Sequence, residues 1–257
     1  MKKMCMAAMS MLLLSLGWQS SAIAAETVAE IGANANPVDF RACNFREGKD
    51  QLDLAPLLVK FRNYAKQKDV GYAAWILKPE FHSSNDFDFG WLGAWPDGIA
   101  YGNSMERWKR DGKSLAAEIN SVVDCSSSHE LAMSLPINAP DGTPEDGVML
   151  FYACNLKEGI SLKEAYKAQL DYGQTMKAKG SLSVSWMYAP AAGAGPDAPD
   201  YYHVLGFYRY SDLGDTMELF VNRGGIETRQ KILAPVASCL TPDIYDAVSV
   251  RAHDETN

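Results

Sequence analysis

The sequence contains one segment twice. Residues 40–79 match residues 151–190 without a gap, at a displacement of 111 positions. Ten of the forty aligned positions are identical, whereas average composition gives roughly two or three identities by chance. A second pair of similar segments, residues 102–108 and 214–220, follows the first. The chain is therefore a duplicated domain, and any fold that it adopts must be built from two similar units of about one hundred residues each.

Four of the five cysteines follow this duplication. Cys43 and Cys154 occupy the same position of the two copies, and Cys125 and Cys239 each lie near the end of a unit. Four cysteines allow three pairings, and the duplication favours Cys43–Cys125 with Cys154–Cys239, because each unit then contains one copy of the same bond. A structural metal site needs close pairs such as C-x-x-C, and the sequence has none.

Residues 1–25 have the pattern of a secretory signal peptide. Lys2 and Lys3 precede an apolar run at residues 11–17, and residues 22–24 form a small-x-small cleavage site. The apolar run is too short to span a bilayer, and no later segment approaches the length needed, so no membrane span is predicted. We expect a periplasmic or secreted protein, in a compartment where disulfides are stable.

The charge balance argues against a nucleic-acid partner. Removal of Lys2 and Lys3 with the signal leaves 22 of the 24 basic residues against 32 acidic ones, a net charge of −10. Nucleic-acid surfaces need clustered lysine and arginine. An acidic balance is also the ordinary condition of a soluble exported protein. The sequence leaves the oligomeric state unknown.

Hydrophobic periodicity predicts the order β-α-β-β-α-β in both units. In the first unit the strands are predicted at residues 39–45, 72–77, 86–95 and 129–135, and the helices at 54–65 and, interrupted by Gly112, at 105–123. Pro79 is expected to end the second of these strands. In the second unit the strands are predicted at 148–156, 182–188, 201–210 and 244–250, and the helices at 162–179 and 215–237.

This order predicts an α+β fold of two tandem ferredoxin-like βαββαβ repeats, at residues 38–135 and 148–252. The fourth strand of such a repeat lies antiparallel beside the first, which brings Cys43 towards Cys125 and Cys154 towards Cys239. Residues 26–37 are expected to form a flexible leader. Residues 136–147, with three prolines and two glycines, are expected to link the repeats, and residues 189–200 to form a mobile loop.

Two such repeats in one chain resemble the dimeric α/β-barrel superfamily. The resemblance covers residues 37–251 and rests on element order and duplication. It implies that two four-stranded sheets pack face to face as an intramolecular pseudo-dimeric α/β barrel. The superfamily includes cofactor-free monooxygenases, lactone isomerases and haem proteins, so the resemblance implies a fold without selecting a reaction. No catalytic residues of a characterised family carry over to this chain.

Aromatic side chains suggest a ligand pocket in the first repeat. Large and small side chains alternate over residues 86–95, which places Trp91 and Trp95 on one face, with Tyr72 on the neighbouring predicted strand. Such a face can line a pocket for an apolar or planar ligand, and it can equally fill the core of a small domain. Trp91 and Trp95 align with Val204 and Tyr208 in the second repeat, so we predict the pocket in the first.

Two asparagines are further candidates for ligand binding. Asn44 and Asn155 each follow the cysteine of the first strand of a repeat. An amide at a strand end can orient a carbonyl group or a water molecule. The alternative is that each amide caps the Glu-Gly turn that follows it.

The histidines give no standard catalytic or metal-binding pattern. His203 lies in a predicted strand and aligns with Gly90, so it could act as a haem ligand or a base in one repeat, or it could be an ordinary core histidine. His82 with Asp86 and Asp88 matches no standard metal spacing. We therefore predict no metal and no cofactor, with haem as the alternative that His203 leaves open.

Two functions agree with these observations. The first is an exported small-molecule-binding protein or cofactor-free enzyme, whose small apolar or aromatic ligand lies in the aromatic pocket near Asn44. The second is a non-catalytic interaction or structural protein that uses its acidic surface or the loop at 189–200. The sequence has no H-E-x-x-H, G-x-S-x-G or G-x-G-x-x-G motif, so no reaction is assigned.

Overall fold

The computed structural model describes residues 31, 34–68, 70–82, 87–140 and 144–252. The predicted signal peptide and most of the predicted leader lie outside the described residues. The first half contains β1 (Asn36–Phe45), α2 (Gln51–Gln67), β2 (Ala73–Phe81), β3 (Phe89–Ala94), α3 (Gly98–Asp111), α4 (Lys113–Asn120) and β4 (Val123–Asn138). The second half contains β5 (Gly147–Leu156), α5 (Leu162–Ala178), β6 (Val184–Ala192), β7 (Tyr201–Phe207), α6 (Tyr210–Asn222), α7 (Gly225–Ile232), β8 (Ala237–Cys239) and β9 (Asp243–Arg251).

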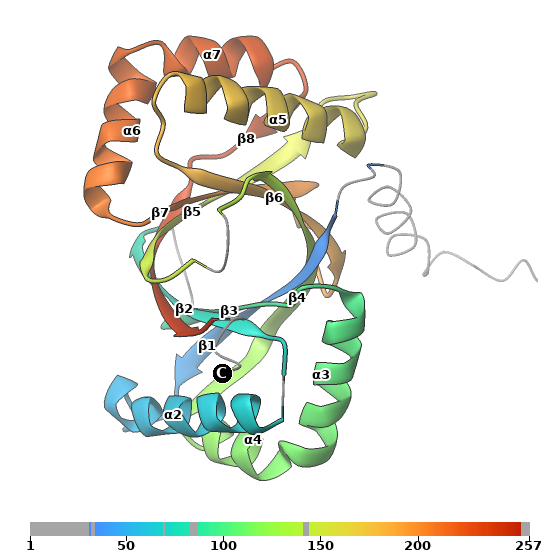
Figure 1. Ribbon diagram of the computed structural model, residues 1–257, viewed down its shortest axis with the longest axis vertical. Coiled ribbons are helices and arrows are strands. Elements are labelled where there is room, and N and C mark those ends of the chain that lie inside the picture. Colours follow the sequence, from blue (N-terminus) through green and yellow to red (C-terminus); the bar gives the residue numbers. More distant parts are fainter. Residues whose placement is uncertain (1–30, 32–33, 69, 83–86, 141–143, 253–257) are drawn as a thin grey trace, which may run out of the picture.

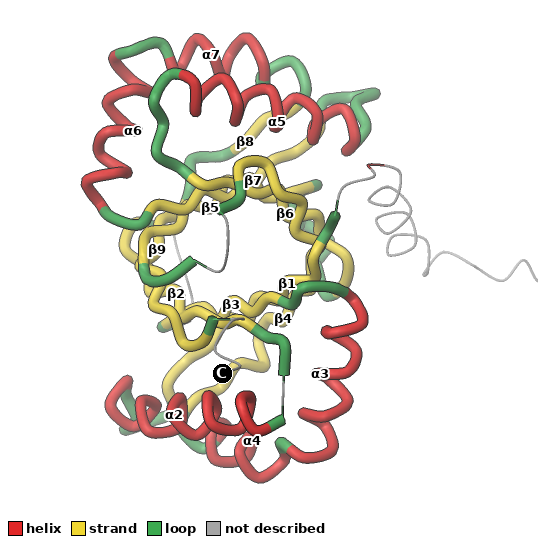
Figure 2. The backbone as a smooth tube through the Cα atoms, viewed as in Figure 1, coloured by secondary structure: helices red, strands yellow, loops and turns green. Residues whose placement is uncertain are grey.

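The strands form one closed antiparallel barrel (Figures 1 and 2). The strand order is β4-β1-β3-β2 in the first half and β9-β5-β7-β6 in the second, with β8 beside β5. The two halves join at two seams, where β2 pairs with β9 and β4 pairs with β6. The α+β barrel architecture is therefore present. The two four-stranded sheets expected from the resemblance join edge to edge into one continuous sheet.

Alternation along the strands separates two apolar regions. One apolar region lies inside the barrel, where a single cluster of buried residues includes Trp75, Leu92, Val204 and Tyr245. Alternate residues face outwards, where α2, α3 and α4 cover the first half and α5, α6 and α7 cover the second (Figure 1). Because helices cover the outer face, both faces of every strand are needed for packing.

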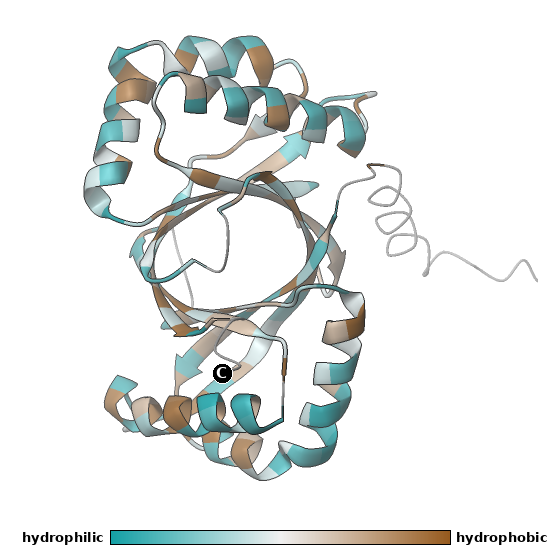
Figure 3. Ribbon diagram, viewed as in Figure 1, coloured by the Kyte–Doolittle hydropathy of each residue, from teal (hydrophilic) through white to brown (hydrophobic). Residues whose placement is uncertain are grey.

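The helices are amphipathic and begin at well-defined caps. In Figure 3 they carry both apolar and polar residues along their lengths. The side chain of Asp50 forms a capping box at the start of α2, and Ser161 forms one at the start of α5. Gly48 and Gly159, at φ of 71° and 77°, make the turn before each cap, where a left-handed backbone favours glycine. The repeated Glu-Gly pair is thus a strand-to-helix turn.

Each half contains one disulfide, as the duplication predicted. Cys43 is bonded to Cys125 and Cys154 to Cys239, over sequence separations of 82 and 85. Cys154 and Cys239 are direct partners in the β5–β8 ladder. Cys43 lies at the point where the register between β1 and β4 shifts, opposite the extra residues of β4. The first bond therefore joins β1 to β4, and the second joins β5 to β8.

Prolines do not end the strands where we expected. Pro79 lies inside β2, which continues to Phe81. Beyond Leu77 the strand pairs with β9 alone, and an edge tolerates a proline that has no N–H to donate. Pro136 likewise lies inside β4, which extends to Asn138 because it pairs with β6 at the seam.

Other element ends also differ from the prediction. The single helix predicted at 215–237 is two helices, α6 and α7, which begin at Tyr210 and end at Ile232, and the short strand β8 follows them. Strand β6 extends to Ala192, so the segment that we predicted as a mobile loop over 189–200 begins only after that residue. Helix α3 begins at Gly98, where the side chain of Asp97 caps it, seven residues before the predicted start. Val123 begins β4 instead of ending a helix. None of the helices among the described residues is long and apolar enough to cross a membrane.

Candidate functional site

A cavity of about 200 Å³ lies between the first half of the barrel and its covering helices. We call it the helix-side cavity. It brings together Tyr72, Trp91 and Trp95, the three aromatic residues that the sequence suggested. The other aromatic residues that line it are Phe61 and Tyr64 from α2, Phe89 from β3 and Trp108 from α3.

The aromatic rings of this cavity hold one another in place. The Phe61 ring meets the Trp91 ring edge-on, with centroids 5.4 Å apart, and meets Trp108 in the same way at 6.1 Å. Tyr72 packs on Trp95 with centroids 4.6 Å apart. Edge-to-face and offset pairs of this kind add to the stabilisation from burial. The cavity therefore has rigid aromatic walls before any ligand arrives.

A chain of hydrogen bonds runs beneath one wall of the cavity. Trp91 Nε1 donates to the Tyr72 hydroxyl at 2.6 Å, and that hydroxyl donates to Asp39 Oδ1 at 3.4 Å. Asp39 is only 2 % exposed. Arg41 Nε donates to Asp39 Oδ2 at 3.0 Å, and His129 Nε2 lies 2.9 Å from the same oxygen. We call these five residues the Asp39 cluster, in which a buried carboxylate is paired as its burial requires.

Gly93 makes room for the Asp39 cluster. A Cβ atom at this position would lie 2.1 Å from the Tyr72 hydroxyl oxygen and 2.3 Å from Asp39 Oδ1. Both distances are far below van der Waals contact, so any other residue would push Tyr72 and Asp39 apart. Burial, and then the charge of Asp39, raise the pKa of Tyr72 well above its usual value. The hydroxyl therefore stays protonated and acts as a donor.

Two hydrogen-bonding atoms of the cavity wall lack a partner. Trp95 Nε1 and the Tyr64 hydroxyl are both buried, and neither bonds to any described residue. Both residues line the helix-side cavity. A buried donor left unpaired costs about 1–3 kcal/mol. An acceptor atom on a ligand would remove this cost.

The two candidate asparagines lie away from the cavity. Asn44 Oδ1 accepts a hydrogen bond from Asp88 N at 3.0 Å, which fastens the segment before β3 to the end of β1. Asn155 is exposed and pairs with Ser238 in the β5–β8 ladder. Neither asparagine lines the helix-side cavity.

His203 corresponds to Trp91 rather than to Gly90. Arg41 pairs with Trp91 across β1 and β3, and Tyr152 pairs with His203 across β5 and β7. Our alignment was therefore one residue out of register, and a slip of one residue moves a side chain to the opposite face of a sheet. By the same pairing Phe207, not Tyr208, stands where the first half has Trp95.

His203 is buried between the barrel and the helices of the second half. Its ring stacks on Tyr152 at 5.7 Å and meets Tyr172 edge-on at 6.2 Å. Burial, and then the charge of Arg229, lower the pKa of His203 to about 3. The ring is thus a neutral core group, and it lines neither the helix-side cavity nor the two barrel cavities described below.

The second half does not repeat the Asp39 cluster. Leu150 stands where the first half has Asp39, and Ser183 stands where it has Tyr72. The position of Gly93 is taken by Leu205, since Asp39 pairs with Gly93 and Leu150 pairs with Leu205. The polar cluster and its glycine are therefore features of the first half alone.

Sequence reasoning missed the polar members of the site. Asp39, Arg41, His129 and Gly93 come from three different strands and share no local spacing. One signal was present, because Asp39 and Arg41 alternate with Val38 and Phe40 in a predicted strand. Charged residues on an alternating strand usually face water. In this fold helices cover the outer face of the sheet, so a charged residue on that face, such as Asp39, is buried and needs polar partners.

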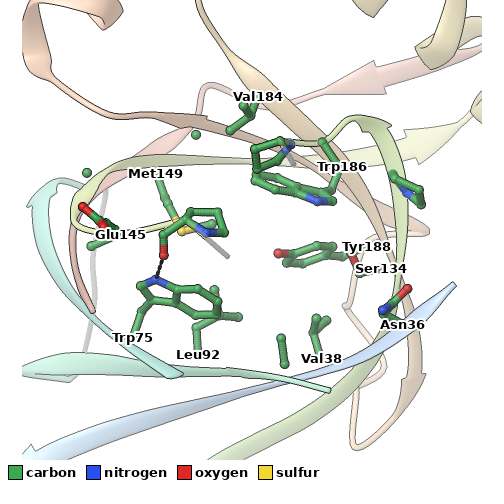
Figure 4. Close-up of a pocket in the computed structure, with 18 of the residues that line it drawn as sticks. Asn36, Val38, Trp75, Leu92, Ser134, Glu145, Met149, Val184, Trp186 and Tyr188 are labelled. Carbon is green, nitrogen blue, oxygen red and sulfur yellow. Dashed lines mark hydrogen bonds between the residues drawn. The ribbon is translucent and has the colours of Figure 1, made fainter. Parts of the chain in front are cut away.

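The barrel itself encloses two further cavities, of about 450 Å³ and about 620 Å³. Figure 4 shows the first, into which the recurring tryptophans Trp75 and Trp186 both point, with Met149 and Tyr188. Trp75 Nε1 donates to the carbonyl oxygen of Pro144 at 3.0 Å, so the segment between the halves contacts the mouth of the barrel. The tryptophans that recur in both halves are thus interior residues of the barrel.

Comparison with known proteins identifies the fold. No family model matches the sequence, and no curated protein matches it. A Fusobacterium nucleatum protein provisionally described as a monooxygenase superposes with a TM-score of 0.54 at 10% identity, over 86% of this chain and 94% of its own. A heme-binding protein from Thermus thermophilus gives 0.50 at 11% identity, over 83% and 91%. A variant of the chlorite dismutase from Candidatus Nitrospira defluvii gives 0.51 at 7% identity, over 86% and 95%. These structures and the closed barrel show that the chain has the dimeric α/β-barrel fold, completed within a single polypeptide.

Proposed function

We propose that this chain is an exported small-molecule-binding protein or cofactor-free enzyme of the dimeric α/β-barrel type, with its ligand in the helix-side cavity. The two halves are, in this proposal, tandem ferredoxin-like repeats of which only the first keeps the site. The observation that carries it is a buried aromatic cavity with two unpartnered polar atoms, Trp95 Nε1 and the Tyr64 hydroxyl. The monooxygenase-like and heme-binding descriptions of the structural neighbours support a small-molecule role.

The dimensions and polarity of the cavity define its ligand. Drug-sized ligands occupy roughly 300–1,000 Å³, so a cavity of about 200 Å³ suits a smaller molecule. The walls offer aromatic faces, and Trp95 Nε1 offers an unpaired N–H. We therefore propose a small planar or apolar molecule that carries at least one hydrogen-bond acceptor, such as a carbonyl oxygen.

The Asp39 cluster would position groups rather than remove protons. The pKa of Tyr72 is raised by burial and by Asp39, so its hydroxyl keeps its proton at neutral pH. Asp39 already accepts bonds from Arg41 and Tyr72. The proposed role of this cluster is to fix the orientation of Trp91 and Tyr72 against the ligand.

Haem does not fit the helix-side cavity. Haem is held by an axial histidine, cysteine, methionine or tyrosine, and it is a drug-sized group that needs roughly 300 Å³ or more. The cavity of about 200 Å³ is smaller than this, it is lined by no histidine, and its one cysteine, Cys125, is in a disulfide. Met105, Tyr64 and Tyr72 also line it, but burial raises the pKa of both tyrosines and so disfavours the tyrosinate that would bind iron. His203 packs against Tyr152 and Tyr172 on the far half. We assign no step to haem.

Tryptophan fluorescence tests this proposal. Titration with small aromatic ketones, aldehydes and phenols should quench the emission of the wall tryptophans at saturating ligand. The Trp95→Phe variant keeps a ring but removes the N–H donor, so affinity for an acceptor-bearing ligand should fall about tenfold, the value of one hydrogen bond.

The matched control is Trp75→Phe, which changes a tryptophan inside the barrel instead. It should leave affinity within about twofold. Equal losses in both variants, or a flat response to the whole panel, would contradict the proposal. A stoichiometric protein partner in native mass spectra of the protein from its own host, with no bound small molecule, would favour the interaction role instead.

A further inference from the structure

The second cavity inside the barrel contains the carboxyl group of Glu130, which has no hydrogen-bond or ion-pair partner among the described residues. We call this cavity of about 620 Å³ the Glu130 cavity, and Asp39 is the one member of the Asp39 cluster that also lines it. Phe40 points into it from β1, and Glu130 points into it from β4, as its register partner. The helix-side cavity and the Glu130 cavity therefore share strands but no lining residue.

Glu130 has no partner among the described residues. It is partly buried, and within the described chain no lysine, arginine or histidine lies in ion-pair contact with it and no group donates to its carboxyl oxygens. Burial raises the pKa of this carboxyl. A carboxylate that is partly removed from water without a cation or donor destabilises the fold.

Aromatic rings line the same cavity as the Glu130 carboxyl. Phe151 meets Tyr245 edge-on at 5.6 Å, and both line the cavity with Tyr188 and Tyr202. The pKa of Tyr202 is raised to about 12 by burial first and then by the charges of Glu130 and Tyr245, which places these groups within electrostatic reach of one another. Among the described residues that line the cavity none is a lysine or arginine, His82 is the one histidine, and Asp39 and Asp243 are the other carboxyl groups.

A carboxylate enclosed by aromatic faces is the chemistry that binds an ammonium group. The ring faces attract a cation through their quadrupoles, and the attraction grows when the cation leaves water. The carboxylate supplies the opposite charge, and a bound cation would remove the cost of burying Glu130. A neutral or anionic ligand would leave that cost unchanged or raise it.

We propose that the Glu130 cavity binds an organic cation, an ammonium group on an apolar body, with Glu130 as its counter-ion and Tyr202 and Tyr245 as its aromatic walls. This site is additional to the helix-side cavity and does not depend on it. The organic body would occupy the apolar interior towards Leu92 and Tyr188.

Two soluble probes of the same shape test the charge requirement. Choline carries a quaternary nitrogen, and 3,3-dimethylbutan-1-ol has a carbon in its place. Isothermal titration calorimetry of the purified protein should show choline binding at least tenfold more tightly than the alcohol. The Glu130→Gln variant should lose most of this preference while its affinity for the alcohol changes less than twofold.

The chain offers a matched control at the other mouth of the barrel. Glu145 lines the first barrel cavity, so Glu145→Gln removes the same charge at the wrong site and should leave choline binding within twofold. Glu130→Gln should also unfold at an equal or higher temperature than the native protein, which separates lost binding from lost folding. Equal binding of the two probes, or unchanged choline affinity in Glu130→Gln, would overturn the proposal, as would failure of choline to bind.

Discussion

Gly93 is the residue on which the Asp39 cluster most depends. The cluster brings a tyrosine hydroxyl and a buried carboxylate together where a side chain would normally stand. Glycine in a strand interior is unfavourable for the strand itself. Its presence at this position is therefore explained by the polar contact that it permits.

Replacing Gly93 by alanine should separate Tyr72 from Asp39. The added methyl would overlap both oxygen atoms, and the cost of overpacking plus a weakened buried hydrogen bond is about 2–4 kcal/mol. Gly102→Ala is the control, since a Cβ there meets nothing within 4 Å and the residue lies inside α3. That variant should gain about 0.5–1 kcal/mol. Urea unfolding of both variants measures the difference, and equal stabilities would contradict the role given to Gly93.

His203 should make the stability of the fold depend on pH. Its pKa is about 3 in the folded protein and about 6.5 in an unfolded chain. Below pH 6.5 the unfolded chain binds a proton that the folded one refuses, so stability is complete above that pH and is lost as the pH falls towards 3.

Between pH 7.5 and pH 5 this single group should cost about 2 kcal/mol of unfolding free energy. The His203→Leu variant has a side chain that does not titrate, so its unfolding free energy should fall by that much less over the same interval. Urea unfolding at the two pH values, with both proteins in the same buffers, measures this. Identical pH dependence in the two proteins would show that His203 is not held neutral.

At the residue scale, the size and alternation of aromatic side chains pointed to three residues of one cavity wall, and their role in binding stays a prediction. Tyr72, Trp91 and Trp95 were suggested by size and alternation, and all three line one cavity. Asp39 and His129 were missed because their partnership depends on the β1–β4 register, which no local pattern encodes. The misalignment of His203 with Gly90 also arose because strand register cannot be read from local pattern. Between the first and third strands the two halves differ in length by one residue.

At the scale of elements, the repeat was a reliable guide to what each half contains. The order of strands and helices in the first half, the break at Gly112 and one disulfide for each half were predictable from local pattern and duplication. In the second half, the break between α6 and α7 and the short strand β8 were not predicted. Strand ends were not. Pro79 and Pro136 lie within strands because each strand reaches across a seam to the other half, and that contact is invisible within one repeat.

The disulfides should stabilise each half separately. Closing a loop of 82 residues contributes roughly 4 kcal/mol in the chain-entropy model. A Cys43→Ala, Cys125→Ala double variant should therefore lose about 2–5 kcal/mol of unfolding free energy. Peptide mapping without reduction should still find Cys154 joined to Cys239. A peptide that links Cys43 to Cys154 would contradict the strand order of the barrel.

At the scale of the whole molecule, the two seams make one folding unit out of two repeats. Strands β2 and β9, and β4 and β6, pair over long lengths, and the barrel interior is filled from both halves. A half alone would expose the interior face that carries Trp75 or Trp186. The barrel was predicted only from the resemblance to a known superfamily. The pattern within one repeat does not show which of its edge strands will pair with the other repeat.

Thermal unfolding should accordingly be a single transition. Leu77 lies in the barrel interior on the first half and Val204 on the second, both fully buried. Leu77→Ala should lower the stability by about 2–5 kcal/mol. Calorimetry of Leu77→Ala and of Val204→Ala should show one peak in each case, with the calorimetric and van't Hoff enthalpies equal. Two resolved peaks in either variant would mean that the halves unfold independently.

The closed single-chain barrel also changes how its sites can be inherited. In a homodimer of identical chains, each codon specifies a residue in both subunits. A substitution that improves the site in one subunit therefore also occurs in the other. In this chain Gly93 and Leu205 occupy equivalent positions but are encoded by different codons, as are Trp91 and His203. One half can therefore keep a cavity at a position where the other half has large buried side chains. The proposed function therefore predicts one helix-side ligand for each barrel, half of what a symmetric assembly would carry.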